Sequence, residues 1–177
     1  MKKISVCLTF SGTIYARLIR WFTKAQYSHV SLALEEDKTR WYSMGRKGKN
    51  KFWVVRFQVE DVKQRFTEWF PNTELMILER EVTDETYEKI KMIIEEYKKE
   101  EEKYKYNYLG IIGMVFNTGI EHNNRYFCSQ LIADILNEVE ILNLAVPPVL
   151  TKPMDFVNDE DYVKIYEGDV RTYLANI

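Results

Sequence analysis

The sequence predicts a single α+β domain over residues 1–177, with a central antiparallel sheet of about five or six strands and helices packed against it. Runs of alternating apolar and polar residues dominate the first half of the chain, and longer segments with helical periodicity dominate the second half. No composition shift, internal repeat or low-complexity segment marks a domain boundary. With 46% hydrophobic and 29% charged residues, 177 residues suffice for one well-formed core.

The first half of the chain contains most of the expected strands, which read as short runs of largely apolar or alternating character. They cover residues 4–9, 30–34, 39–44, 52–59 and 74–80. After the first strand, Ser11-Gly-Thr13 can cap a helix over residues 14–23 that places Ile14, Leu18 and Trp21 or Phe22 on one face. A charged turn at 35–38 joins the second strand to the third, and a glycine-punctuated loop at 45–50 follows.

The second half contains the clearest helical pattern. Thr83 or Asp84 caps a helix whose apolar residues recur at helical spacing, namely Tyr87, Ile90, Ile94 and Tyr97. An apolar, glycine-containing segment at 108–116 is far shorter than the roughly 20 residues of a membrane span. A further helix is expected from about Phe127 to Glu138, and residues 162–166 are the expected last strand.

Charge and cysteine content exclude several classes of protein. A net charge of −2 with interleaved signs leaves no basic surface of the kind that binds nucleic acid. The first ten residues are too polar and too short in their apolar run for a secretory signal, so we expect a cytoplasmic protein with free thiols rather than a Cys7–Cys128 disulfide. No Cys-x-x-Cys or His-x-x-x-His spacing indicates a metal site, and we expect no cofactor.

Two residues, Cys128 and His29, indicate a thiol-based chemistry. Cys128 lies where a helix is expected to begin, and a helix N-terminus together with an imidazole is a common way to stabilise a thiolate. His29 lies in the second strand, and a hairpin turn centred on Glu36 would place Ser43 directly opposite it. The plainer alternatives are a packing cysteine and a half-exposed strand histidine. His122, in a polar loop, is an alternative base.

The order of three segments resembles the circularly permuted branch of the papain-like NlpC/P60 superfamily. These are the Ser-His-Val strand around His29, the segment 42–46, and the Tyr-Phe-Cys-Ser-Gln-Leu-Ile segment around Cys128. The resemblance implies a permuted papain-like fold, with Cys128 as the nucleophile and His29 as the general base. It also implies that Ser43 occupies the position of the third polar residue, and that Tyr27, Arg46 and Ser129 contact the substrate.

The function implied is a cysteine hydrolase that cleaves an amide or an acyl ester bond in a small peptide or acyl substrate. Serine carries no charge that could stabilise an imidazolium, so the alternative is a catalytically silent ligand-binding module on the same fold. Glu35 and Glu36 are nearby substitutes for Ser43, although a turn orients them poorly. A third possibility, an interaction protein, rests on the many aromatic residues between 41 and 70.

Overall fold

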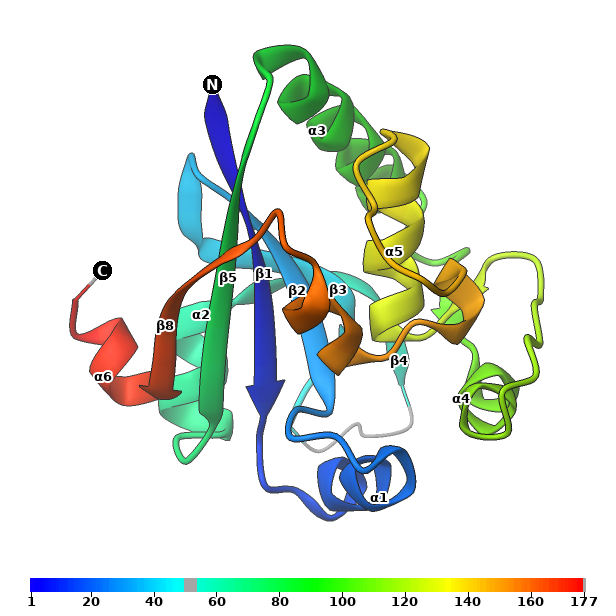
Figure 1. The fold of residues 1–177 in the computed structure, drawn as a ribbon. Helices are drawn as coiled ribbons and strands as arrows, with labels where there is room; N and C mark the ends of the chain where they lie inside the picture. The colour runs from blue at the N-terminus through cyan, green and yellow to red at the C-terminus, as the bar shows by residue number, and fades with distance from the viewer. Residues whose placement is uncertain (50–53, 177) are drawn as a thin grey trace.

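The computed structural model describes residues 1–49 and 54–176, and one curled sheet forms the centre of the fold (Figure 1). Over those residues eight strands form the sheet, in the order β7-β6-β4-β3-β2-β1-β5-β8. Neighbouring strands are antiparallel except for β6 and β7, which are parallel. The strands are β1 (Lys2–Phe10), β2 (His29–Leu34), β3 (Asp37–Arg46), β4 (Val55–Asp61), β5 (Glu74–Val82), β6 (Lys105–Tyr106), β7 (Arg125–Tyr126) and β8 (Val163–Asp169).

Helices cover both faces of this sheet. They are α1 (Ile14–Thr23), α2 (Val62–Gln64), α3 (Asp84–Lys99), α4 (Tyr108–Val115), α5 (Cys128–Glu138) and α6 (Val170–Leu174), with a π-helical turn at Arg65–Trp69 and 3₁₀ turns at Pro148–Leu150 and Pro153–Asn158. The larger core lies under α3 and α5, where their apolar residues pack on alternate side chains of β1 and β2. A smaller core on the opposite face contains Trp41 from β3, Phe66 from the π-helical turn and Val170 from α6.

The two long helices of the larger core follow from sequence periodicity and capping. Thr83 accepts a hydrogen bond from the backbone N–H of Thr86 and begins α3, whose Tyr87, Ile90 and Ile94 are buried. Helix α5 begins at Cys128, and its apolar face packs on β2 and β3. The predictions for these two helices are confirmed. Thr13 likewise caps α1 over the predicted residues 14–23, accepting a hydrogen bond from the N–H of Ala16.

The predicted sheet is wrong in size and type, although the α+β class is confirmed. Instead of five or six antiparallel strands, the described residues form a mixed sheet of eight. Strands β6 and β7 have two residues each, too few to show the alternation by which a strand is detected in a sequence. The aromatic stretch before β5 is partly helical. Phe52 and Trp53 of the predicted fourth strand lie outside the described residues.

Candidate active site

Cys128 is the first residue of α5, the position at which a helix presents its unpaired backbone N–H groups. The residue before it, Phe127, gives the helix no side-chain cap, and the first backbone bond of the helix runs from Leu131 N–H to the Phe127 carbonyl. The backbone N–H groups of Val30 and Ser129 help to lower the pKa of the thiol. These donors and the positive end of the helix favour a thiolate at Cys128.

His29 is the first residue of β2, so its imidazole lies at the end of the strand, next to the first turn of α5. Its side chain is only 17% exposed. The Nε2 atom lies 3.1 Å from Glu60 Oε1, 3.3 Å from Ser31 Oγ and 3.4 Å from Ser43 Oγ. Because Nε2 is engaged by these oxygens, Nδ1 is the ring nitrogen left to exchange a proton with the Cys128 thiol.

Glu60, near the end of β4, is the carboxylate that orients this imidazole. Its side chain is fully buried, and it accepts hydrogen bonds from Ser43 Oγ at 2.8 Å and from Ser31 Oγ at 3.0 Å. Arg65 Nη1 lies 3.3 Å from Glu60 Oε1 and forms an ion pair with it. A buried carboxylate costs free energy unless its charge is paired and its oxygens are hydrogen-bonded, and Glu60 meets both conditions.

The pKa shifts of Cys128, His29 and Glu60 all favour the charged form of the side chain. Burial raises the pKa of the Cys128 thiol, but the hydrogen bond and charge of His29 outweigh burial and leave that pKa below its usual range. Burial lowers the pKa of His29, whereas the charge of Glu60 and the contacts with Cys128 raise it to about 9. Burial raises the pKa of Glu60, but Arg65 and His29 hold it well below its usual range. The directions of these shifts favour a thiolate, an imidazolium and a carboxylate at the site.

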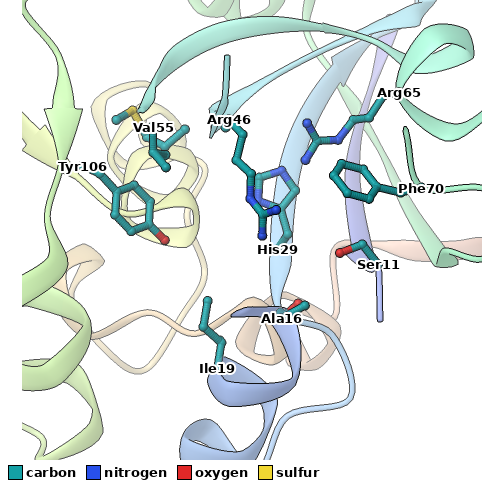
Figure 2. A pocket seen from close by; sticks show the side chains of 12 residues that line it. Ser11, Ala16, Ile19, His29, Arg46, Val55, Arg65, Phe70 and Tyr106 are labelled. Carbon is teal, nitrogen blue, oxygen red and sulfur yellow. The ribbon is translucent and has the colours of Figure 1, made fainter. Parts of the chain in front are cut away.

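A small pocket of about 50 Å³ opens beside the imidazole (Figure 2). His29 and Arg46 lie near its centre, Arg65 and Phe70 stand on one side and Tyr106 on the other. Gly45 also lines it, and a Cβ atom at that position would clash with the Gln58 amide nitrogen and lie 2.5 Å from a Glu60 oxygen. Glycine at position 45 therefore keeps the space that the buried carboxylate occupies.

The structure brings some of the predicted site residues together and separates others. Cys128, His29 and Ser43 meet, and Arg46 lines the pocket beside His29. Tyr27 is buried in the larger core, and its hydroxyl donates to Glu167 at 3.4 Å, so its polar end points to β8. The Ser129 hydroxyl donates to the Thr151 carbonyl at 2.6 Å, although its backbone N–H contacts the thiol.

Ser43 lies in a different register from the one predicted. A β-bulge near Leu34 shifts the hairpin, and Leu32 pairs with Tyr42. Continuing that register by one residue places Ser43 beside Ser31 rather than opposite His29. The Ser43 hydroxyl still reaches the imidazole, but its shortest contact is with the Glu60 carboxylate. Ser43 therefore supports Glu60 and is not the main group that orients the histidine.

Sequence reasoning missed Glu60, although a signal was present. Arg56, Gln58 and Glu60 alternate with apolar residues and thus share one face of β4, and Gln58 pairs with Ser43. Continuing the alternation by one position beyond the predicted strand would have placed a carboxylate on the face of Ser43. Whether that face was solvated or buried depends on Arg65, which the chain brings back over it after β4.

The remaining candidates lie elsewhere. Cys7 is buried in the smaller core, and burial holds the pKa of its thiol well above the usual range. Both cysteines are free thiols. His122 lines a different pocket, together with Asp134 and Gln130. Among the residues that the structure describes, no three His, Cys, Asp or Glu side chains are arranged to hold a metal ion.

Comparisons with known proteins give a likeness of fold alone. No family model matches the chain. No curated protein matches it either. Among solved structures, it is similar to the crystal structure described as metalloprotein yiiX from Escherichia coli O157:H7, DUF1105, with a TM-score of 0.59 at 11% identity, over 94% of this chain and 97% of that one. The metal in that description belongs to that protein, and the residues described here offer no matching cluster of ligands.

This likeness corrects the expected fold. The similar structure named above is a DUF1105 protein, and the described residues form an eight-stranded mixed sheet in place of the expected permuted papain-like sheet of five or six strands. The resemblance of the His29 and Cys128 segments to the NlpC/P60 superfamily stays a prediction from short motifs. Over residues 1–49 and 54–176, no helix combines the length and apolar character needed to cross a bilayer.

Proposed function

We propose that this chain is a cysteine hydrolase that cleaves an amide or an acyl ester bond. The observation that carries the proposal is the buried contact series from Cys128, at the start of α5, through His29 to Glu60. A nucleophile, a base and a group that orients the base are the three parts of a nucleophilic hydrolase site. Both cysteines are free thiols, which supports a reducing compartment, and we place the activity in the cytoplasm.

In the first half of the reaction, the Cys128 thiolate attacks the carbonyl carbon of the substrate. Backbone N–H groups in the first turn of α5 are the nearest donors for the oxyanion that forms. The tetrahedral intermediate collapses as the His29 imidazolium gives its Nδ1 proton to the leaving amine or alcohol. The products of this half are a thioester on Cys128, a neutral imidazole and the released amine or alcohol.

In the second half, neutral His29 takes a proton from water, and the hydroxide oxygen attacks the thioester carbonyl. Collapse releases the carboxylic acid and restores the thiolate and the imidazolium. Glu60 stays ionised throughout, holds Nε2–H, and stabilises the positive ring in the resting state. Arg46, which lines the pocket beside His29, is the side chain we assign to an anionic part of the substrate.

The Glu60 carboxylate favours this proposal over a silent binding module. That alternative rested on Ser43 as the orienting group, because a hydroxyl cannot stabilise an imidazolium by charge. With a buried carboxylate 3.1 Å from Nε2, the imidazolium has its counter-charge. A binding module has no need of a buried charge series that ends in a nucleophile.

The test is a panel of peptide amides, acyl esters and acyl thioesters incubated with wild type and with Cys128→Ser. Intact-mass measurement should show an acyl adduct on wild type that peptide mapping places on Cys128, with Cys7 unmodified as the internal control. Turnover should be lost in the variant. Ligand binding by both proteins with no adduct and no turnover would assign the pocket to a binding module instead.

A further inference from the structure

Helix α1 turns its apolar face outward. Ile14, Leu18, Trp21 and Phe22 share this face and are between 50% and 81% exposed. The sequence pattern is that of an amphipathic helix, yet the side chains that a core would bury lie at the surface. Trp21 and Phe22 are in edge-to-face contact, with ring centroids 4.7 Å apart, so the two largest side chains form one aromatic projection.

Helix α4 has an exposed apolar surface of its own. Leu109, Ile112 and Phe116 are between 54% and 75% exposed, and no residue from 108 to 116 is charged. Figure 1 draws α1 and α4 at the same lower end of the molecule. Both helices lie near the candidate site. Ala16 and Ile19 of α1 line the His29 pocket, and so does Tyr106, which precedes α4. The Tyr106 ring lies 4.9 Å from that of Tyr108, the first residue of α4.

The charge around α1 has one sign. Residues 14–24 contain Arg17, Arg20 and Lys24 and no acidic residue, in a chain whose net charge is −2. Arg17 and Lys24 are exposed. Basic residues beside exposed tryptophan, phenylalanine and leucine are the composition of helices that lie in the headgroup region of an anionic bilayer.

We propose that α1 and α4 dock the protein onto the surface of an anionic lipid bilayer. The apolar residues enter the boundary between headgroups and acyl chains, and the basic residues of α1 face lipid phosphates. A second copy of the chain fits this surface less well. A two-fold interface would bring the three positive charges of α1 against the same three on the other copy.

The position of the docking face gives it a use. A lipid lifted from the bilayer between α1 and α4 would enter at the pocket that His29 lines, and the same imidazole contacts Cys128. Naming a membrane acyl lipid as the substrate class rests on the proposed function, whereas the docking itself does not. Each can therefore be tested separately.

Co-sedimentation with vesicles tests the docking. The full chain should bind vesicles of phosphatidylcholine mixed with phosphatidylglycerol about tenfold or more tightly than vesicles of phosphatidylcholine alone. The double variant Ile14→Glu/Trp21→Glu should lose about tenfold or more of this binding, and Arg17→Gln/Lys24→Gln should lose the preference for the anionic vesicles. Met92→Glu is the matched control, since Met92 is 64% exposed on α3, and it should bind like wild type.

Iodoacetamide labelling of Cys128 in each variant shows that the site is intact. If the wild-type chain does not bind vesicles although its Cys128 is labelled rapidly, the docking proposal is overturned and the proposed function is unaffected. Vesicle binding without any adduct or turnover would overturn the proposed function alone. A lipid-free dimer that Ile14→Glu/Trp21→Glu dissociates, detected by analytical ultracentrifugation, would assign this face to a second copy and overturn the bilayer proposal.

Discussion

Helices α1 and α5 have the same kind of sequence pattern, but the apolar face of α5 is buried and that of α1 is exposed. Both are amphipathic, both begin near the candidate site, and both have apolar residues at helical spacing. In α5 that face packs on β2 and β3, and Leu131 and Ile132 are fully buried. In α1 the equivalent face points away from the sheet, and Trp21 is 72% exposed.

The difference teaches that periodicity identifies an apolar face without saying what covers it. Helix α5 follows a connection that returns it to the middle of the sheet, so its burial fixes the first turn and the Cys128 thiol in place. Helix α1 lies in the connection between the end of β1 and the start of β2, and its outer face remains available for a ligand surface. We therefore expect changes in α5 to affect chemistry and stability, and changes on the outer face of α1 to have little effect on either with a water-soluble substrate.

The largest expected effect is on catalysis. Cys128→Ala should lower the rate of hydrolysis on the order of 10⁴-fold or more, because it removes the nucleophile. Trp21→Ala in α1 should leave the rate on a short, water-soluble acyl ester within about twofold of wild type, because its effect on stability is small. Steady-state kinetics on that ester measure both. A Cys128→Ala variant that retains a tenth of the activity would remove the thiol from the mechanism.

Glu60→Gln should lower the rate of hydrolysis by about 10²- to 10⁴-fold, because the amide cannot stabilise the imidazolium by charge. The pKa of His29 should fall from about 9, and the pKa of the Cys128 thiol should rise as its counter-charge is lost. The rate of iodoacetamide labelling, measured against pH, should therefore climb at a higher pH in the variant than in wild type. Glu79→Gln is the control, since Glu79 forms an ion pair with Lys3 on β1.

Unchanged labelling in Glu60→Gln would mean that the thiolate depends on the helix terminus alone. In wild type the labelling rate should already be near its plateau below about pH 8.5, the usual pKa of a free thiol. Cys7 should stay unlabelled in the same samples, because burial holds the pKa of its thiol well above the usual range.

A matched pair of leucines tests the comparison on stability. Leu131→Ala in α5 should lower the free energy of unfolding by about 2–5 kcal/mol, because Leu131 is fully buried. Leu18→Ala in α1 should change the free energy of unfolding by only about 0.5 kcal/mol, because Leu18 is half exposed. Urea unfolding followed by circular dichroism measures both. Equal losses would show that something covers the α1 face in solution.

The smallest effect is expected at Ser43. Ser43→Ala removes one hydrogen bond to Glu60, which leaves those from Ser31 and His29 and the Arg65 ion pair, so the rate should fall by about tenfold or less. Ser31→Ala is the matched variant, because Ser31 donates to the same carboxylate and should cost a similar amount. A loss in Ser43→Ala as large as that in Glu60→Gln would restore Ser43 as the orienting group.

Much of the candidate site could be predicted from the sequence because its parts are local. The position of Cys128 at a helix start and the strand containing His29 each depend on a few neighbouring residues, as does the Thr83 cap of α3 outside the site. Local rules also give the α+β class. They do not give the size of the sheet, because β6 and β7 are defined only by their partner strands.

The sequence by itself determined which residues carry reactive groups and which helices are amphipathic. Only the tertiary structure decided that Glu60 is the partner of His29 and that the apolar face of α1 stays outside. A carboxylate becomes an orienting group only when Arg65, Ser31 and Ser43 surround it and water is excluded, which requires three strands and the π-helical turn to converge. An apolar face becomes core only where another layer covers it, and that depends on how the whole chain is connected.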